Sequence, residues 1–352
     1  MTSLDDVARA AGVSAATVSR ALSGRGNVST STRAKIQKVA AELDYVASSA
    51  ASSLASGRMR NLGVIMPELH RWFFNTVLTG ISDEATSAGY DVTLYNVTGD
   101  PEVRREIFSA FLRRRRVDAV VVVALELSDW EEQELTRLEI PVVIIGGTPG
   151  VLPGVAIDDL AITELATAHL LELGHEVLGF LGGAERFDAD YKVPSQRREG
   201  FDRALRRRGL QTHPALIGEA DFTIPGGFHA ARQLLGMPGT GMTGLVAASD
   251  EMAIGAILAA RELGMRVPED LSVVGIDGHE LGGLFELTTV DQHAQHQGAT
   301  AAKLILATVE AGGAQPEKLD LSFDLLVRRS TARLAPTADQ PTAVWRPSGP
   351  AS

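Results

Sequence analysis

Residues 4–22 have the sequence LDDVARAAGVSAATVSRAL, which predicts two short helices joined by a tight turn. In the first helix, 4–11, the apolar side chains fall at helical spacing, and Ser3 with Asp6 can form a capping box. Gly12 can end this helix in the left-handed conformation, and Ser14 can cap a second helix over 15–22. Two helices joined in this way are typical of the helix-turn-helix, whose second helix enters the DNA major groove. A plain helical hairpin is the alternative.

A third helix is predicted from Thr32 to Leu43, and the three helices together form a head over residues 1–45. The first 60 residues hold eight Lys/Arg and four Asp/Glu, a net charge of +4, although the whole chain has a formal net charge of −11. The remainder therefore carries −15. A basic head on an acidic body directs affinity for phosphates to one end of the chain.

The string 4–22, continued by Val28, Thr32-Arg33, Glu42-Leu43 and Tyr45, resembles the head of the lactose/galactose-repressor family of transcription regulators. The resemblance places Ala15, Ala16 and Arg20 at base-reading positions of the recognition helix. Arginine can bond O6 and N7 of guanine together, and alanine can touch a thymine methyl group. Hydroxyl groups can bond phosphate oxygens without reading sequence. The candidates for phosphate contacts are Ser14, Thr17, Ser19 and Ser31.

Residues 46–60, VASSAASSLASGRMR, have the composition of a linker. In the family this hinge becomes a short helix on DNA, and a leucine, here Leu54, wedges into the minor groove. The alternative is that Leu54 is an isolated hydrophobic residue in a disordered linker and has no role in DNA binding. The usual proline, asparagine and arginine of the hinge are missing, which puts its stiffness and its phosphate contacts in doubt.

From residue 61 onward, short apolar strands alternate with amphipathic helices. Strands are predicted over 62–66, 91–96, 119–123, 142–146, 177–182, 245–248 and 272–276, and helices over 73–87, 101–115, 160–173, 195–207 and 251–263. This alternation predicts parallel sheets covered on both faces, and the number of strands suits two sheets better than one. Ligands bind such folds at the carboxyl ends of the strands, here in a cleft between two lobes.

The body, 61–335, resembles the two-lobed, periplasmic-binding-protein-like sensor of the same family in motifs such as Arg197-Arg198-Glu199-Gly200-Phe201 and Val274-Gly275-Ile276-Asp277. The resemblance places Arg197 and Asp277 in an effector cleft. Their chemistry fits this role, since both side chains can bond vicinal hydroxyls of a sugar. Arg197 could instead form a surface ion pair, and Asp277 could cap a turn before Gly278. Further lining is expected from Phe73, Phe222, Ser249 and Gln292. Only one of Phe73 and Phe74 is expected to face the site, and Ser249 replaces the family's usual asparagine.

Other functions find little support in the sequence. There is no cysteine, and the eight histidines show no metal-ligand spacing, so neither a metal nor a cofactor is expected. The arginine runs 113–116 and 206–208 are interpreted as solvated helix ends rather than a second nucleic-acid patch. No secretory signal, membrane span or catalytic motif is apparent, which disfavours the alternatives of a secreted sugar receptor and a sugar-modifying enzyme. The tail, 336–352, is predicted to be disordered.

The resemblance therefore predicts a cytoplasmic, dimeric repressor. It would bind a near-palindromic DNA operator and respond to a small-molecule effector, a sugar, with dimers as the expected assembly because the tail has no leucine heptads.

Overall fold

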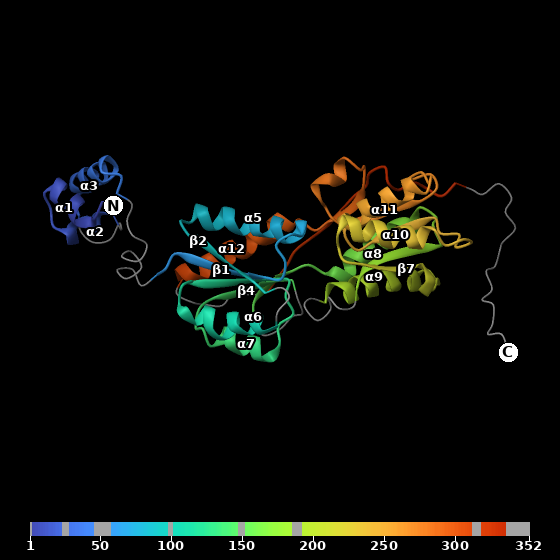
Figure 1. Cartoon of the computed structure of the whole chain (residues 1–352), viewed down its shortest axis with the longest axis horizontal. Coiled ribbons are helices and arrows are strands. Elements are labelled where there is room, and N and C mark those ends of the chain that lie inside the picture. Colours follow the sequence, from blue (N-terminus) through green and yellow to red (C-terminus); the bar gives the residue numbers. More distant parts are fainter. Residues whose placement is uncertain are drawn as a thin grey trace.

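The computed structural model describes residues 2–22, 28–45, 58–97, 101–146, 152–184, 192–311 and 318–335. It shows a helical head and two α/β lobes, as the sequence predicted (Figure 1). The expected hinge at 46–60, including Leu54, and the tail at 336–352 lie outside the described residues, except for 58–60.

The head consists of α1 (Leu4–Ala11), α2 (Ala15–Leu22) and α3 (Thr30–Glu42). The capping box of Ser3 and Asp6 is present, Gly12 has φ 67°, and the Ser14 hydroxyl accepts a hydrogen bond from the amide of Thr17. The predicted start of the third helix was two residues late, because Ser29 rather than a later residue provides the N-cap. The three helices enclose a small core of Val7, Ala8, Ala11, Val18, Ala21, Ile36 and Ala40.

The first lobe, here the N-lobe, is built on a six-stranded parallel sheet in the order β11-β5-β4-β3-β1-β2. Its strands are β1 (Asn61–Met66), β2 (Asp91–Asn96), β3 (Ala119–Val123), β4 (Val142–Ile145), β5 (Gly154–Ala156) and β11 (Leu319–Asp320). Helices α5 (Trp72–Ser87) and α12 (Ala294–Ala311) contribute to the core on one face, and α6 (Pro101–Glu106) and α7 (Asp129–Thr136) lie at the other.

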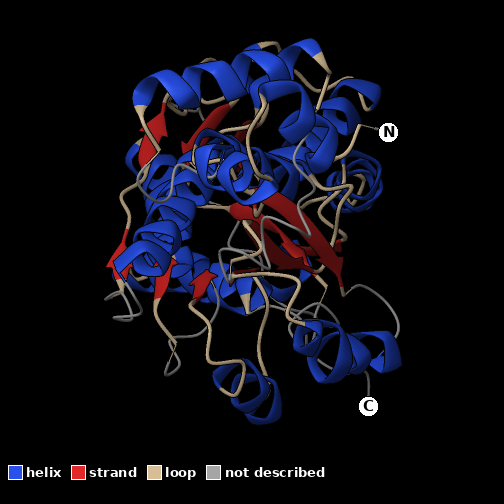
Figure 2. Ribbon diagram, turned by 90° about the vertical axis from the view of Figure 1, so that its left-hand side faces the viewer, coloured by secondary structure: helices blue, strands red, loops and turns tan. Residues whose placement is uncertain are grey.

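The second lobe, the C-lobe, has a sheet in the order β12-β10-β9-β8-β6-β7, parallel except for β12. Its strands are β6 (Leu178–Gly183), β7 (Ile217–Ala220), β8 (Gly244–Ala247), β9 (Ser272–Asp277), β10 (Thr288–Asp291) and β12 (Asp324–Leu326). Its helices are α8 (Asp159–Glu172), α9 (Val193–Arg207), α10 (Ile224–Leu235) and α11 (Asp250–Glu262), and Figure 2 shows helices packed about the sheets.

The chain crosses between the lobes three times: after β5, after β10, and between β11 and β12. The second crossing places α12 in the N-lobe, where it packs against α5. The two helices approach closely at Gly80 and Gly298, since a Cβ atom on either would lie 2.0 Å from a carbonyl oxygen of the other helix. This close packing leaves no room for a larger residue.

The prediction of one helix over 101–115 was wrong in its detail. Helix α6 ends at Glu106, and the backbone continues as a π-helical turn, Ile107–Phe111, and a 3₁₀ turn, Leu112–Arg114. Phe108 and Leu112, in these irregular turns, are both part of the N-lobe core.

Candidate effector cleft and DNA-facing helix

Helix α2, the expected recognition helix, presents an open surface of small and polar side chains. Ser14, Ala16 and Arg20 are exposed, and Ala15, Thr17 and Ser19 are half-buried, whereas Val18 and Ala21 turn into the head core. The guanidinium Nε of Arg20 donates to the carbonyl of Ala16, 3.1 Å away, one turn earlier. Ser31 is exposed in the first turn of α3. All the described candidates for DNA contact are therefore at least partly accessible.

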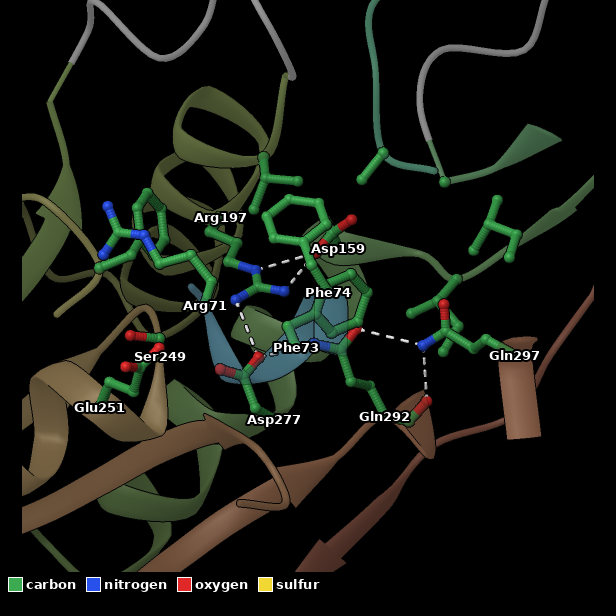
Figure 3. A pocket seen from close by; sticks show the side chains of 16 residues that line it. Arg71, Phe73, Phe74, Asp159, Arg197, Ser249, Glu251, Asp277, Gln292 and Gln297 are labelled. Carbon is green, nitrogen blue, oxygen red and sulfur yellow. Dashed lines mark hydrogen bonds and ion pairs between the residues drawn. The ribbon is translucent and has the colours of Figure 1, made fainter. Parts of the chain in front are cut away.

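A cleft lies between the carboxyl ends of the strands of the two lobes, with an empty volume of about 710 Å³ including its open mouth (Figure 3). All six residues expected to line an effector site are in its wall: Phe73, Arg197, Phe222, Ser249, Asp277 and Gln292. They come from α5 of the N-lobe, from α9 and β9 of the C-lobe, and from segments next to β7, α11 and β10.

Arg197 is the centre of the polar part of this cleft. Its side chain is 6% exposed, and its Nε and Nη2 atoms lie 2.8 Å from one carboxylate oxygen of Asp159. Its Nη1 lies 3.5 Å from Asp277 and also donates to the carbonyl of Ala248. Burial opposes the charge of Arg197, but the two aspartates outweigh burial and hold its pKa above the ordinary value. The alternative of a surface ion pair is therefore wrong.

Asp277 ends β9 with φ 134°, a backbone conformation that is costly for a residue other than glycine. Its carboxylate accepts hydrogen bonds from the side-chain amide of Gln292 at 2.6 Å and from the backbone of Asp250. Asp277 thus lines the cleft, whereas the amides of Gly278 and His279 in the following turn donate to the carboxylate of Asp250, so the alternative that Asp277 caps this turn is wrong. Gln297 in turn donates to the backbone carbonyl of Gln292 at 2.8 Å, which fixes that side of the wall.

Three acidic side chains lie close together in and next to this wall. Burial raises the pKa of Asp277 to about 6, while Arg197 and Gln292 lower it. Burial and the charge of Asp277 raise the pKa of Asp250, the first residue of α11, to about 7. The pKa of Glu251 is also raised. Burial and the charge of Asp277 raise it to about 7, although Arg71 and the backbone N–H of Trp72 lower it. Closely spaced acids of this kind favour ligand groups that donate hydrogen bonds.

Aromatic rings form the apolar part of the cleft. Phe73 and Phe74 both line it, with ring centroids 5.5 Å apart in an edge-to-face arrangement, so the expectation that only one of them faces the site was wrong. Phe74 belongs at the same time to the core of the N-lobe. Phe222 packs so closely on Gly183 that a Cβ atom there would lie 2.1 Å from its ring.

Ser249 lines the cleft, but its hydroxyl accepts a hydrogen bond from the amide of Met252 and caps α11. The sequence did not predict the polar lining residues Arg71, Asp159, Glu251 and Gln297. A signal for Asp159 was available, since Asp158 caps α8 and the next residue then begins the helix at the carboxyl end of β5. The other three become lining residues only when distant segments meet, which sequence periodicity does not show.

Trp72, the first residue of α5, joins the N-lobe to the C-lobe at the edge of the cleft. Its indole N–H donates to the carboxylate of Glu280 at 2.5 Å, and its ring stacks on His279 at a centroid distance of 4.6 Å. Its backbone N–H donates to Glu251, so a carboxylate of the C-lobe satisfies the amino end of an N-lobe helix. These three contacts exist only while the lobes are close together.

Within the described residues, no group of three or more His, Cys, Asp or Glu is arranged to hold a metal ion. None of the helices in the same described ranges is both long and apolar enough to cross a membrane.

Comparison with known proteins covers both parts of the chain. The family described as "Bacterial regulatory proteins, lacI family" matches residues 3–48, and the "Periplasmic binding protein-like domain" matches residues 167–331. The ribose operon repressor of Halalkalibacterium halodurans is 32% identical over 335 residues, which are 94% of this chain and 97% of the relative. The transcriptional repressor CytR of Escherichia coli K12 is 31% identical over 335 residues, 94% of this chain and 96% of the relative.

Solved structures give the same result. The lac repressor dimer bound to operator and the anti-inducer ONPF has a TM-score of 0.81 and 27% identity, and the match covers 94% of this chain and 99% of that one. The transcriptional regulator CelR in complex with cellobiose has a TM-score of 0.69 and 27% identity, with coverage of 94% and 100%. Relatives above 30% identity that match along nearly their whole length, together with this two-part architecture, show that the chain belongs to the lacI family of bacterial regulatory proteins.

Proposed function

We propose that the protein is a cytoplasmic transcriptional repressor that binds a near-palindromic operator as a dimer and responds to a sugar in the cleft. The observation that carries the proposal is the buried Arg197–Asp277 pair, set among aromatic rings in an interlobe cleft, on the same chain as a helix-turn-helix head. Relatives of the same architecture are repressors, which supports a regulator without catalytic activity.

In the head, Arg20 and the flanking Ala15 and Ala16 would read base edges from α2. Ser14, Thr17, Ser19 and Ser31 would bond phosphates and fix the position of the helix. A head of this size reads only a short half-site, so two heads on a two-fold operator are needed for selectivity. Leu54, outside the described residues, would add a minor-groove wedge within a hinge over 46–60.

In the cleft, Arg197 and Asp277 would bond neighbouring hydroxyls of the sugar, and Gln292 would orient Asp277. Phe73 and Phe222 would cover the apolar face of the ring. Because the two lobes each contribute part of the wall, a ligand that bonds both favours the closed arrangement. Such coupling to DNA affinity is typically about 1–3 kcal/mol.

The test begins with repeated selection of random duplex DNA by the purified protein at low and moderate salt. A near-palindrome is the expected product, and failure of the folded dimer to enrich any sequence would refute the proposal for the head. The enriched duplex then reports on a panel of neutral sugars, including ribose and cellobiose. Asp277→Asn should keep operator affinity and lose the response to the active sugar; a normal response would refute its assignment.

A further inference from the structure

The loops that lead into the parallel strands of the N-lobe sheet form one edge, here called the head-side edge. The chain arrives there from the head at Arg58, and Figure 1 shows β1 beginning on that side. Its described loops, 58–60, 88–90, 115–118, 137–141, 152–153 and 318, contain six basic residues and two acidic ones. These are Arg58, Arg60, Arg115, Arg116, Arg137 and Lys318 against Asp118 and Glu139. Arg137 and Lys318 form ion pairs with Glu134 and Asp320, so the local positive excess of this edge comes from the arginines at 58–60 and 115–116.

Two of these loops are joined rigidly. The carboxylate of Asp118 accepts hydrogen bonds from the amides of Met59 and Arg60, at 2.8 and 2.6 Å. The side-chain amide of Asn61 donates to the carbonyl of Arg116 at 2.9 Å. Asp118 therefore holds the segments 58–60 and 115–118 side by side, so the backbone positions of their arginines are fixed relative to each other.

Backbone geometry indicates that the fold does not require an arginine at position 60 or 115. Arg60 has φ 50° and Arg115 has φ 51°, the left-handed conformation that glycine adopts most easily. An arginine there costs free energy that a glycine would not. Both are exposed, as is Arg116, and none of the three forms an ion pair within the described parts of the chain. Arg114 next to them is exposed, with its guanidinium 4.3 Å from the ring of Phe111.

We propose that the head-side edge is a second DNA contact, in which Arg60, Arg114, Arg115 and Arg116 bind phosphates of the operator duplex held by the head. This inference rests on the proposed DNA binding and adds a surface to it. Arginine is well suited to phosphate oxygens because its fork of N–H donors matches their geometry. The chain outside the described residues, 46–57, spans at most about 40 Å, which limits how far DNA held by the head can lie from this edge. The proposal would give Arg114, Arg115 and Arg116 a role in addition to that of a solvated helix end.

The test uses the full-length protein and the duplex enriched by selection, with affinity measured by fluorescence anisotropy between 50 and 200 mM KCl. The variant Arg60→Gly with Arg115→Gly removes two cations at positions where glycine is at least as favourable to the fold. The variant Arg114→Gln with Arg116→Gln removes the other two. The control is Arg208→Gln with Arg333→Gln, which removes two exposed arginines of the C-lobe.

We expect the salt slope to fall by about 0.9 for each phosphate that an arginine no longer neutralises, and affinity at 0.1 M salt to fall on the order of tenfold for each such phosphate. Base preference and melting temperature should be unchanged, or the melting temperature of the glycine variant raised. A salt slope equal to that of the control would overturn the proposal, as would an altered base preference. Failure of the wild type itself to bind DNA would refute the proposed function instead, so the two failures are distinguishable.

Discussion

Trp72→Phe should shift the equilibrium between the closed and open cleft toward the open form. The indole N–H donates to Glu280 at 2.5 Å, and phenylalanine keeps an aromatic ring over His279 but has no donor. A hydrogen bond to a charged acceptor contributes about 1.5–3 kcal/mol. Because Glu280 is exposed and Trp72 only half-buried, about 1 kcal/mol is the appropriate value here. That loss changes the closed-to-open ratio about fivefold.

The absence of cysteine makes the measurement direct, because two introduced cysteines can be labelled without background. Thr86→Cys on α5 and Gln233→Cys on α10 place spin labels on exposed positions of the two lobes. Electron–electron double resonance then gives the distribution of distances between the lobes. The matched control is Trp130→Phe, which removes an indole from α7 of the N-lobe, away from the cleft.

A longer-distance population should grow in the Trp72 variant and stay unchanged in the Trp130 control. The apparent affinity for an effector that needs the closed cleft should fall by up to the same factor. If both variants give the wild-type distribution, the contacts of Trp72 do not stabilise closure, and the reasoning from Glu280 and His279 is wrong.

Three further predictions concern the head, the acids of the cleft and the helix pair of the N-lobe. Arg20→Ala should cost about 1–3 kcal/mol at one operator base pair and relax selectivity there, as measured by competition between single-base operator variants; unchanged selectivity would exclude base reading by Arg20. The pKa of Glu251 is about 7 in the folded protein, above its ordinary value of 4.5. Between pH 4.5 and 7 the folded protein therefore binds a proton that the unfolded chain does not, and the free energy of unfolding falls as pH rises through this range. Glu251→Gln should therefore flatten this fall in urea unfolding between pH 5 and 8, and a wild-type slope would count against the raised pKa. Gly80→Ala should lower the free energy of unfolding by about 1–3 kcal/mol, because its methyl group meets the carbonyl of Gln295; the exposed change Ser87→Ala at the end of α5 is its control, and equal stability of the two would contradict the close packing.

Much of the fold was predictable because local signals agree with the tertiary structure. The capping box at Ser3, the left-handed Gly12 and the Ser14 cap each act within four residues, so the first two helices were predicted with their observed bounds. The central strands of the two sheets, such as β3 and β9, are buried on both faces and show as short apolar runs. The start of the third head helix was predicted two residues late, because Ser29 and Ser31 both precede the predicted start at Thr32 and either could cap a helix there.

The cleft was predictable only in part. Arg197 and Asp277 follow from the resemblance to a family, but the burial of Arg197 and its contacts with both Asp277 and Asp159 depend on three segments of the C-lobe meeting: α8, α9 and β9. The change from α6 to a π-helical turn has no glycine or proline to mark it in the sequence IFSAF, and Phe108 and Leu112 remain in the core through it. Arg71 and Glu251 lie on different lobes, so no periodicity could have brought them together.

The order of the elements has a consequence for synthesis on the ribosome. The core of the N-lobe includes α12, and its sheet is completed by β11, so this lobe cannot finish folding until residue 320 has left the exit tunnel. The head needs only its first 45 residues and emerges much earlier. A nascent chain therefore carries a folded DNA-reading unit well before any sensor exists to restrain it, and selectivity for assembled dimers is what keeps such early heads from occupying the operator alone.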